Sequence, residues 1–295
     1  MQVLGSIREL RQALSALRNG ASLRKPTIGF VPTMGALHLG HGRLIETSVR
    51  ETGCTVVSIF VNPSQFNDPA DFAKYPRTLD TDAALCESLG AGIVFAPSVE
   101  EIYPQPQQTF IDVARLTEQL EGAFRPGHFR GVATVVMKLF QMVQPDRAYF
   151  GEKDAQQLAV IRRMVADLNV PVEIIGIATV REPDGLALSS RNQRLTPAER
   201  ALAPLLYQAL QLAASRIAQG SRDPESVKQE ALSVLAHPGI RVEYLEIVDP
   251  IWMEPVPRIE GLVRIAIAAW LGSTRLIDNA LTAPRPWPAP AYRPR

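Results

Sequence analysis

Short apolar segments rich in β-branched residues alternate with amphipathic segments along the first 178 residues of the chain. Such apolar runs suit strands that are covered on both faces of a sheet. The predicted strands are 27–31, 55–61, 93–96, 147–150 and 172–177. Apolar residues at three-to-four spacing predict helices between them, at 41–52, 78–89, 129–143 and 154–168. The alternation predicts the α/β class, with a Rossmann-like parallel sheet and helices on both faces.

The pattern changes near residue 180. Two longer helical segments, 197–219 and 224–236, are followed by strand-like runs at 242–248, 262–269 and 276–279. They predict a smaller C-terminal α+β domain. The last 13 residues contain five prolines and three arginines, which is typical of a solvated extended tail. We therefore expect a Rossmann-like domain over 1–178, a smaller domain over 179–282 and a Pro/Arg-rich tail over 283–295.

Composition and charge disfavour several functional classes. The 31 Lys and Arg against 30 Asp and Glu give a net charge of +1, whereas proteins that bind long nucleic acids usually carry a clustered basic excess. Residues 1–19 lack the pattern of a signal peptide, and no apolar run reaches the roughly 18 residues of a membrane span. Cys54 and Cys86 are too few for a disulfide scaffold. We expect a cytoplasmic protein that binds neither nucleic acid nor membranes.

The segment 30–42 carries the strongest chemical signal, because a predicted strand runs into a glycine-punctuated turn that opens a helix. Free backbone N–H groups and the helix dipole converge at such a turn, which favours phosphate binding. The P-loop needs Lys and then Ser or Thr where this segment has His41 and Gly42. The dinucleotide fingerprint needs a third glycine where this segment has Ile45. What remains is a His-x-Gly-His motif at 38–41, whose imidazoles can stabilise negative charge on phosphate oxygens.

Two other interpretations of this motif stay open. An ordinary strand-to-helix turn can carry surface histidines at the same spacing. A zinc site is the second alternative, but it needs a third and a fourth ligand, and His128 and His237 are the other histidines of the chain.

Six motifs in order along the chain carry a resemblance to one family. The motif at 38–41 resembles the signature of the nucleotidylyl-transferase superfamily, which includes class I aminoacyl-tRNA synthetases. The five others are Phe60-Val61-Asn62-Pro63-Ser64-Gln65-Phe66, Tyr75-Pro76-Arg77-Thr78, Arg125-Pro126-Gly127-His128-Phe129, Gly151-Glu152-Lys153-Asp154-Ala155-Gln156-Gln157 and Leu188-Ser189-Ser190-Arg191-Asn192. Together they are similar to the motifs of the pantothenate synthetase, or pantoate–β-alanine ligase, family over roughly residues 1–282.

The resemblance implies a two-step ligation that consumes ATP. Pantoate and ATP would form pantoyl adenylate and release pyrophosphate, and β-alanine would then displace AMP to give pantothenate. It also implies Mg²⁺ as a cofactor and a homodimer as the assembly. Because acyl adenylates hydrolyse, we expect the smaller C-terminal domain to close over the site as a lid.

The resemblance also assigns roles to single residues. It makes His41 a catalytic proton donor, and His38 and Lys153 are the other predicted catalytic residues. Gln65 is assigned to pantoate and to β-alanine, and Gln157 to pantoate. The residues assigned to ATP are Met34, Gly35, Ala36, Leu37, His38, Leu39, Gly40, His41, Gly151, Glu152, Lys153, Asp154, Val180, Leu188, Ser189, Ser190 and Arg191.

Three further interpretations concern the surroundings of these residues. Asp80 and Asp82 could help to hold Mg²⁺, although the helix dipole favours acidic residues in a first helical turn of any protein. The charge of His41 stays open, because a helix start disfavours an imidazolium and a phosphate favours one. His128 either lines the site or merely belongs to a turn. An apolar wall for the methyl groups of pantoate is predicted from Met34, Phe60 and Val132.

Two rival functions share the motif at 38–41. An enzyme like an aminoacyl-tRNA synthetase should have a basic RNA-binding face. Another nucleotidylyl transferase should leave AMP on its product. A non-catalytic nucleotide sensor would bind ATP without releasing pyrophosphate, and it would not need Gln65 and Gln157 beside two histidines.

Overall fold

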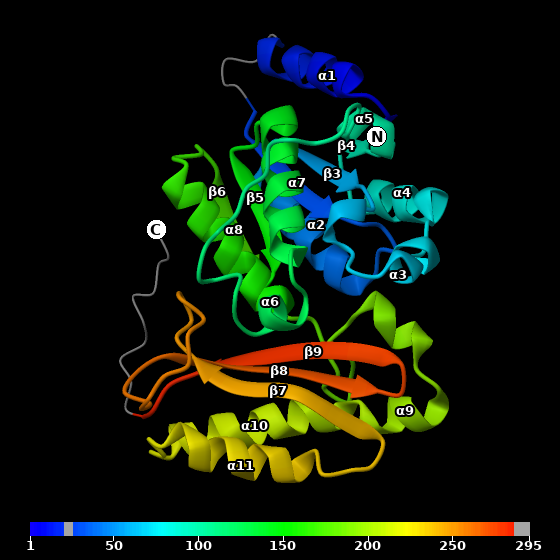
Figure 1. Cartoon of the computed structure of the whole chain (residues 1–295). Helices are drawn as coiled ribbons and strands as arrows, with labels where there is room; N and C mark the ends of the chain where they lie inside the picture. Colours follow the sequence, from blue (N-terminus) through cyan, green and yellow to red (C-terminus); the bar gives the residue numbers. More distant parts are fainter. Residues whose placement is uncertain (21–25, 286–295) are drawn as a thin grey trace.

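The structure is a computed structural model that describes residues 1–20 and 26–285. Two stacked units follow one another along the chain (Figure 1). The first contains a six-stranded sheet in which every neighbouring pair of strands is parallel. Its strand order is β1 (Gln2–Leu4), β4 (Ile93–Phe95), β3 (Cys54–Ile59), β2 (Ile28–Thr33), β5 (Arg147–Gly151) and β6 (Glu173–Ile177). The predicted Rossmann-like parallel sheet is confirmed.

Helices cover both faces of this sheet. Phe30 and Val56 belong to one apolar core, and the next residues of the same strands, Val31 and Val57, belong to another, because successive strand residues point to opposite faces. The first core includes side chains of α1 (Ile7–Asn19), α7 (His128–Val143) and α8 (Ala155–Asp167). The second core includes side chains of α2 (Leu39–Glu51) and α4 (Leu79–Ser88).

Short helical segments fill the connections between these elements. They are η1 (Pro63–Gln65), α3 (Pro69–Lys74), α5 (Val99–Ile102), α6 (Glu121–Phe124), η2 (Glu152–Asp154) and η3 (Ser190–Arg194). The sequence prediction lacks them, and it also lacks β1 and α1. A capping box in which the Ser6 hydroxyl accepts from the Glu9 N–H marks the start of α1.

The second unit is an antiparallel sheet of β7 (Ile240–Val248), β8 (Val263–Leu271) and β9 (Thr274–Thr282). Helices α10 (Pro204–Ala218) and α11 (Pro224–Val234) cover one of its faces, and the other face lies against the first unit (Figure 1). Val248 and Ala266 from this face belong to the apolar core that contains Phe30. The predicted smaller α+β unit is therefore present and is packed on the first.

The predicted single helix at 197–219 is wrong. The structure has α9 (Pro197–Leu202) followed by α10, which begins at Pro204. A proline inside a helix lacks the N–H that would donate to the preceding turn, so the helix is interrupted there. Most of the predicted tail, from residue 286 on, lies outside the described residues. No helix within residues 1–20 and 26–285 is long and apolar enough to cross a membrane.

Candidate active site

The strand order of the first unit reverses between β2 and β5. The chain continues from β2 to β3 on one side, whereas β5 lies on the other side of β2. Such a reversal opens a crevice at the carboxyl ends of the two strands, where α/β sheets bind ligands. His38 and His41 lie at the start of α2, after β2, and Lys153 lies in η2, after β5. The fold therefore brings two motifs that are distant in sequence to one place.

A cavity of about 230 Å³ lies at this crevice. The predicted site residues that line it are Met34, His38, Gly40, His41, Gln65, Gly151, Lys153, Asp154, Gln157, Val180, Leu188, Ser189, Ser190 and Arg191. Phe60 and Val132, predicted for an apolar wall, line it too. Five residues that the resemblance assigns to ATP are not among the described residues that line the cavity: Gly35, Ala36, Leu37, Leu39 and Glu152.

Hydrogen bonds to the backbone orient both imidazoles. His38 is the N-cap of α2, and its Nδ1 accepts from the Gly40 N–H at 3.1 Å. His41 Nδ1 accepts from the His38 N–H at 3.3 Å. Because each Nδ1 is an acceptor, the proton of each neutral ring is assigned to Nε2. The motif thus forms a capping box from two histidines, which leaves both Nε2–H groups as donors.

Both histidines are neutral near pH 7. Burial lowers the pKa of His38, and the charge of Lys153 lowers it further. Burial, with His38 beside it, lowers the pKa of His41 to about 3. Before ATP binds, each ring therefore offers a neutral N–H donor rather than an imidazolium.

Several backbone N–H groups of the turn are already bonded within the protein. The Gly35 N–H donates to Thr33 Oγ1 at 3.2 Å. The N–H groups of Ala36 and Leu37 donate to the two carboxylate oxygens of Asp82 at 2.9 and 2.8 Å. The expectation that the N–H groups of this turn are free for phosphate is therefore wrong for these three residues.

Gln65 lies at the end of η1, held by partners that sequence reasoning missed. Asn62, which is 1 % exposed, donates from its Nδ2 to Gln65 Oε1 at 3.1 Å. The same nitrogen donates to the Gly131 carbonyl at 3.2 Å, and a Cβ on Gly131 would meet the Ser64 carbonyl oxygen at 2.3 Å. Only glycine permits this approach of α7 to η1. The Asn-Pro turn was visible in the sequence, but its contact with α7 was not.

His128 belongs to the site and not merely to a turn, since it lines the cavity. Its Nδ1 lies 2.8 Å from the carbonyl oxygen of Gln65. A carbonyl only accepts, so Nδ1 donates and Nε2 accepts from Arg125 Nη1 at 3.2 Å. Burial and the charge of Arg125 lower the pKa of His128 to about 4, so this ring is neutral too.

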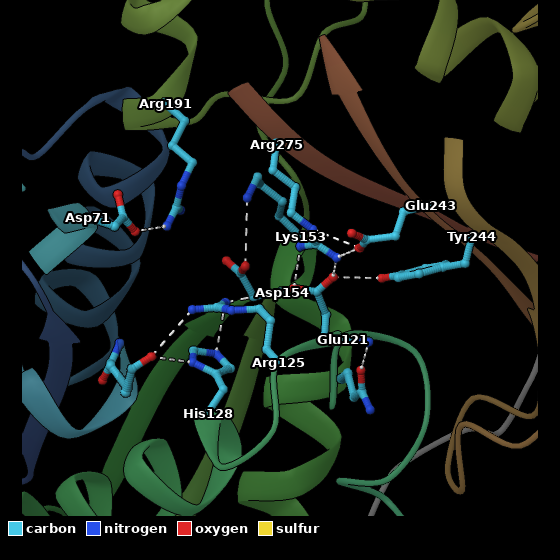
Figure 2. A network of polar contacts seen from close by, with 12 residues as sticks. Asp71, Glu121, Arg125, His128, Lys153, Asp154, Arg191, Glu243, Tyr244 and Arg275 are labelled. Carbon is cyan, nitrogen blue, oxygen red and sulfur yellow. Dashed lines mark hydrogen bonds and ion pairs between the residues drawn. The ribbon is translucent and has the colours of Figure 1, made fainter. Parts of the chain in front are cut away.

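Part of the segment 188–194 lines the same cavity as the two histidines. Ser189, Ser190 and Arg191 line it, and Arg191 Nη2 lies 3.6 Å from a carboxylate oxygen of Asp71 in α3 (Figure 2). Arg194 Nη1 donates to the other oxygen of Asp71 at 2.9 Å. Two hydroxyls and a guanidinium at a cavity wall are well suited to bind phosphate.

A buried polar network joins the second unit to the first (Figure 2). Arg275 of β9 donates to both carboxylate oxygens of Glu121 at 2.8 and 2.6 Å, and it also contacts Glu243. The Tyr244 hydroxyl donates to Glu121 at 2.9 Å. Although burial raises the pKa of Glu121, its bonds to Arg275 hold that pKa below its ordinary value. This carboxylate is therefore charged and fully paired.

The loop that carries Lys153 is also bonded to β9. Asn279 donates from Nδ2 to the carbonyl oxygens of Glu152 and Lys153, at 2.9 Å each. Asn279 itself is buried, and the two hydrogen bonds are partly buried. Sequence reasoning missed Glu121, Arg275 and Asn279, because they stand in no motif and meet only through the packing of the two units.

The two predicted magnesium ligands do not form a metal site. Asp80 is exposed, whereas Asp82 is 2 % exposed and its oxygens accept from Ala36, Leu37 and the Thr78 hydroxyl. Within the described ranges there is no group of three or more His, Cys, Asp or Glu side chains that could hold a metal ion. These residues therefore do not fit a protein-bound Mg²⁺.

Comparison with known proteins gives one consistent result. The family model described as pantoate-beta-alanine ligase matches residues 2–281. The pantothenate synthetase of Moorella thermoacetica is 51% identical over 277 residues, which are 92% of this chain and 98% of that protein. That of Thermotoga petrophila is 48% identical over 282 residues, 95% of this chain and 99% of that protein.

Two solved structures extend the comparison to the fold. The crystal structure of pantothenate synthetase from Thermus thermophilus has a TM-score of 0.88 and 48% identity, and the match covers 95% of this chain and 99% of that one. Pantoate-beta-alanine ligase from Francisella tularensis, complexed with beta-gamma ATP and beta-alanine, has a TM-score of 0.79 and 35% identity, covering 95% and 97%.

Proposed function

The chain belongs to the pantoate–β-alanine ligase family and produces pantothenate, and we propose that its reaction passes through a pantoyl adenylate in the cavity after β2 and β5. In the first step a carboxylate oxygen of pantoate attacks the α-phosphorus of ATP, and the bond to pyrophosphate breaks. In the second step the amine of β-alanine attacks the acyl carbon, and AMP leaves. The relative from Francisella tularensis, complexed with beta-gamma ATP and beta-alanine, supports these two co-substrates.

Charge stabilisation is the main task of the protein in the first step. This assignment rests on one observation: two neutral imidazoles, each with Nε2–H as a donor, line one cavity together with the Lys153 ammonium. Preorganised donors aimed at developing charge lower the barrier without reorganising during the reaction. We assign His38, His41 and Lys153 to the phosphates of ATP. In this assignment His41 acts as a neutral hydrogen-bond donor, which refines the proton-donor role that the resemblance implies.

The remaining lining residues divide between the substrates. Ser189, Ser190 and Arg191, which line the same cavity, also bind the phosphates. The other proposed ATP contacts in the lining are Met34, Gly40, Gly151, Asp154, Val180 and Leu188. Gln65 binds pantoate and β-alanine, and Gln157 binds pantoate. The Gln65 amide nitrogen donates to the weak acceptor Met34 Sδ at 2.9 Å, so a substrate oxygen can replace that contact at little cost.

Three broader assignments accompany this mechanism. We propose that Mg²⁺ reaches the site on the phosphates of ATP, because the oxygens of Asp82 are already bonded inside the protein. We divide the chain after residue 178, since β6 ends at Ile177 and β7 begins at Ile240, and we assign the C-terminal part to covering the adenylate. A homodimer and a cytoplasmic location remain proposals that rest on the family.

One incubation tests the proposed reaction. The protein is mixed with ATP, Mg²⁺, pantoate and β-alanine, and AMP, pyrophosphate and pantothenate are quantified. We expect equal amounts of the three products and, without β-alanine, pantoate-dependent exchange of pyrophosphate into ATP. A transferase that leaves AMP on its product, or a sensor that releases no pyrophosphate, would contradict the proposal.

A further inference from the structure

Asp82 contacts the turn between β2 and α2 through both of its carboxylate oxygens. It stands in the first turn of α4, and its two oxygens accept from the N–H groups of Ala36 and Leu37 at 2.9 and 2.8 Å. The Thr78 hydroxyl donates to Oδ2 at 3.1 Å. Because the side chain is 2 % exposed, these donors replace water as partners of a buried charge.

The backbone that Asp82 binds has an unusual conformation. Gly35 and Ala36 have φ values of 79° and 50°, so two successive residues lie in the left-handed region. This region is disfavoured for a residue that has a Cβ, as Ala36 does. Successive N–H groups in such a turn point toward one anion, and here the anion is a carboxylate of the protein itself. The bonds to Asp82 therefore stabilise a turn that would otherwise be strained.

The hydrogen bonds continue from this turn to the imidazoles. Leu37 is followed directly by His38, whose N–H donates to His41 Nδ1 at 3.3 Å. The N–H of Gly40 donates to His38 Nδ1 at 3.1 Å. The path of the backbone at Ala36 and Leu37 therefore determines where α2 begins and where both Nε2–H groups point.

We propose that Asp82 is a positioning residue for His38 and His41, acting through the left-handed turn, and is not a magnesium ligand. The proposal rests on the proposed roles of the two histidines in adenylation. Asp82 holds the turn before ATP arrives and occupies its inward-facing N–H groups. The phosphates are thereby left to the imidazoles and to the other side chains that line the cavity.

Asp82→Asn tests this role. The substitution removes the charge and replaces one oxygen with an N–H₂ group, which cannot accept a bond from the backbone N–H it faces. We expect kcat for pantoate-dependent ATP–pyrophosphate exchange to fall about 10- to 100-fold, as small misplacements of catalytic groups do. We expect KM for ATP to stay within about threefold, because the charged side chains that bind ground-state ATP are unchanged. The Mg²⁺ concentration that gives half the maximal rate should equal that of the wild type.

Glu87→Gln is the matched control, because it exchanges an exposed carboxylate for an amide on the same helix, near the N-terminal ammonium at 3.7 Å. Its kcat should be that of the wild type. An unchanged kcat in Asp82→Asn, or activity restored by raising Mg²⁺, would overturn the positioning role.

A second variant tests the positioning role of Asp82 if Asp82→Asn does not fold. Thr78→Val keeps the carboxylate and removes one of its donors. A kcat lowered more than about threefold at an unchanged Mg²⁺ requirement supports the proposal, and a wild-type kcat overturns it. Absence of pantoate-dependent exchange in the wild type would instead contradict the proposed function, so the two failures are distinguishable.

Discussion

Two of the ion-paired contacts between the first unit and the part of the chain after residue 178 differ in burial (Figure 2). At the buried contact, Arg275 pairs with Glu121, and the two side chains are 14% and 10% exposed. At the open contact, Asp71 pairs with Arg191 and Arg194, and the side chains are 28%, 29% and 38% exposed. Both contacts join the same two parts of the chain, but water reaches only one of them readily.

The difference in burial gives the two contacts different roles. Separating Arg275 from Glu121 would remove the guanidinium that donates to both oxygens of this buried carboxylate, which is strongly unfavourable. The open contact is screened by solvent, so its contribution to stability is small and Arg191 can exchange Asp71 for a phosphate. We therefore expect the buried contact to stay closed during turnover and the open contact to exchange partners when ATP binds.

The largest expected effect is on stability and comes from Arg275→Met. The substitution removes the guanidinium that Glu121 and Glu243 share, and it leaves Glu121 with Arg125 at 3.8 Å and the Tyr244 hydroxyl. The free energy of unfolding should fall by about 3–5 kcal/mol, which urea unfolding of the variant and the wild type would measure.

The matched variant at the open contact is Arg194→Met, which makes the same exchange on a side chain that is 38% exposed. It should lower the free energy of unfolding by less than about 1 kcal/mol. Similar losses in the two variants would show that the distinction between the contacts is wrong.

A smaller effect is expected from pH, through His128 beside the buried contact. Burial and Arg125 lower the pKa of His128 from 6.5 to about 4. Between these values the unfolded chain binds a proton that the folded chain does not, so the free energy of unfolding falls as the pH falls. From pH 7 to pH 5 this histidine should contribute a loss of about 1–2 kcal/mol.

His128→Asn serves as the control for that measurement. Its amide can still donate to the Gln65 carbonyl, but it does not titrate between pH 7 and 5. Urea unfolding at the two pH values should show a smaller loss in this variant than in the wild type. An equal loss would mean that His128 is not the group responsible.

The smallest effect is expected at the open contact, from Asp71→Asn. Without the carboxylate, the ATP phosphates no longer compete for Arg191. KM for ATP should fall about two- to fivefold, the equivalent of one exposed ion pair, while the urea midpoint hardly changes. A higher KM would indicate that Asp71 holds the 188–194 segment in its binding position instead of competing for it.

The sequence predicts the parallel sheet because its apolar alternation is local information, and it predicts much of the cavity because motifs at the ends of parallel strands meet at one edge. Glu121 and Arg275 could not be predicted in this way. They are 154 residues apart and stand in segments without a motif, so only the packing of the two units shows their contact.

Asp82 and Pro204 show two other limits of sequence reasoning. An acidic residue in a first helical turn has a sufficient local explanation, so nothing in the sequence points to its bonds with Ala36 and Leu37. Pro204, by contrast, is a visible break. The apolar periodicity continues through it, and the prediction followed the periodicity rather than the missing N–H.

The central claim is that the neutral imidazoles after β2 stabilise the adenylation transition state. Pantoate-dependent exchange of pyrophosphate into ATP by His41→Ala measures this step without the second substrate. We predict that the variant unfolds like the wild type and that its exchange rate is at least about 10²–10³-fold lower, as when one preorganised donor is removed. Exchange at the wild-type rate in a folded His41→Ala protein would contradict the account.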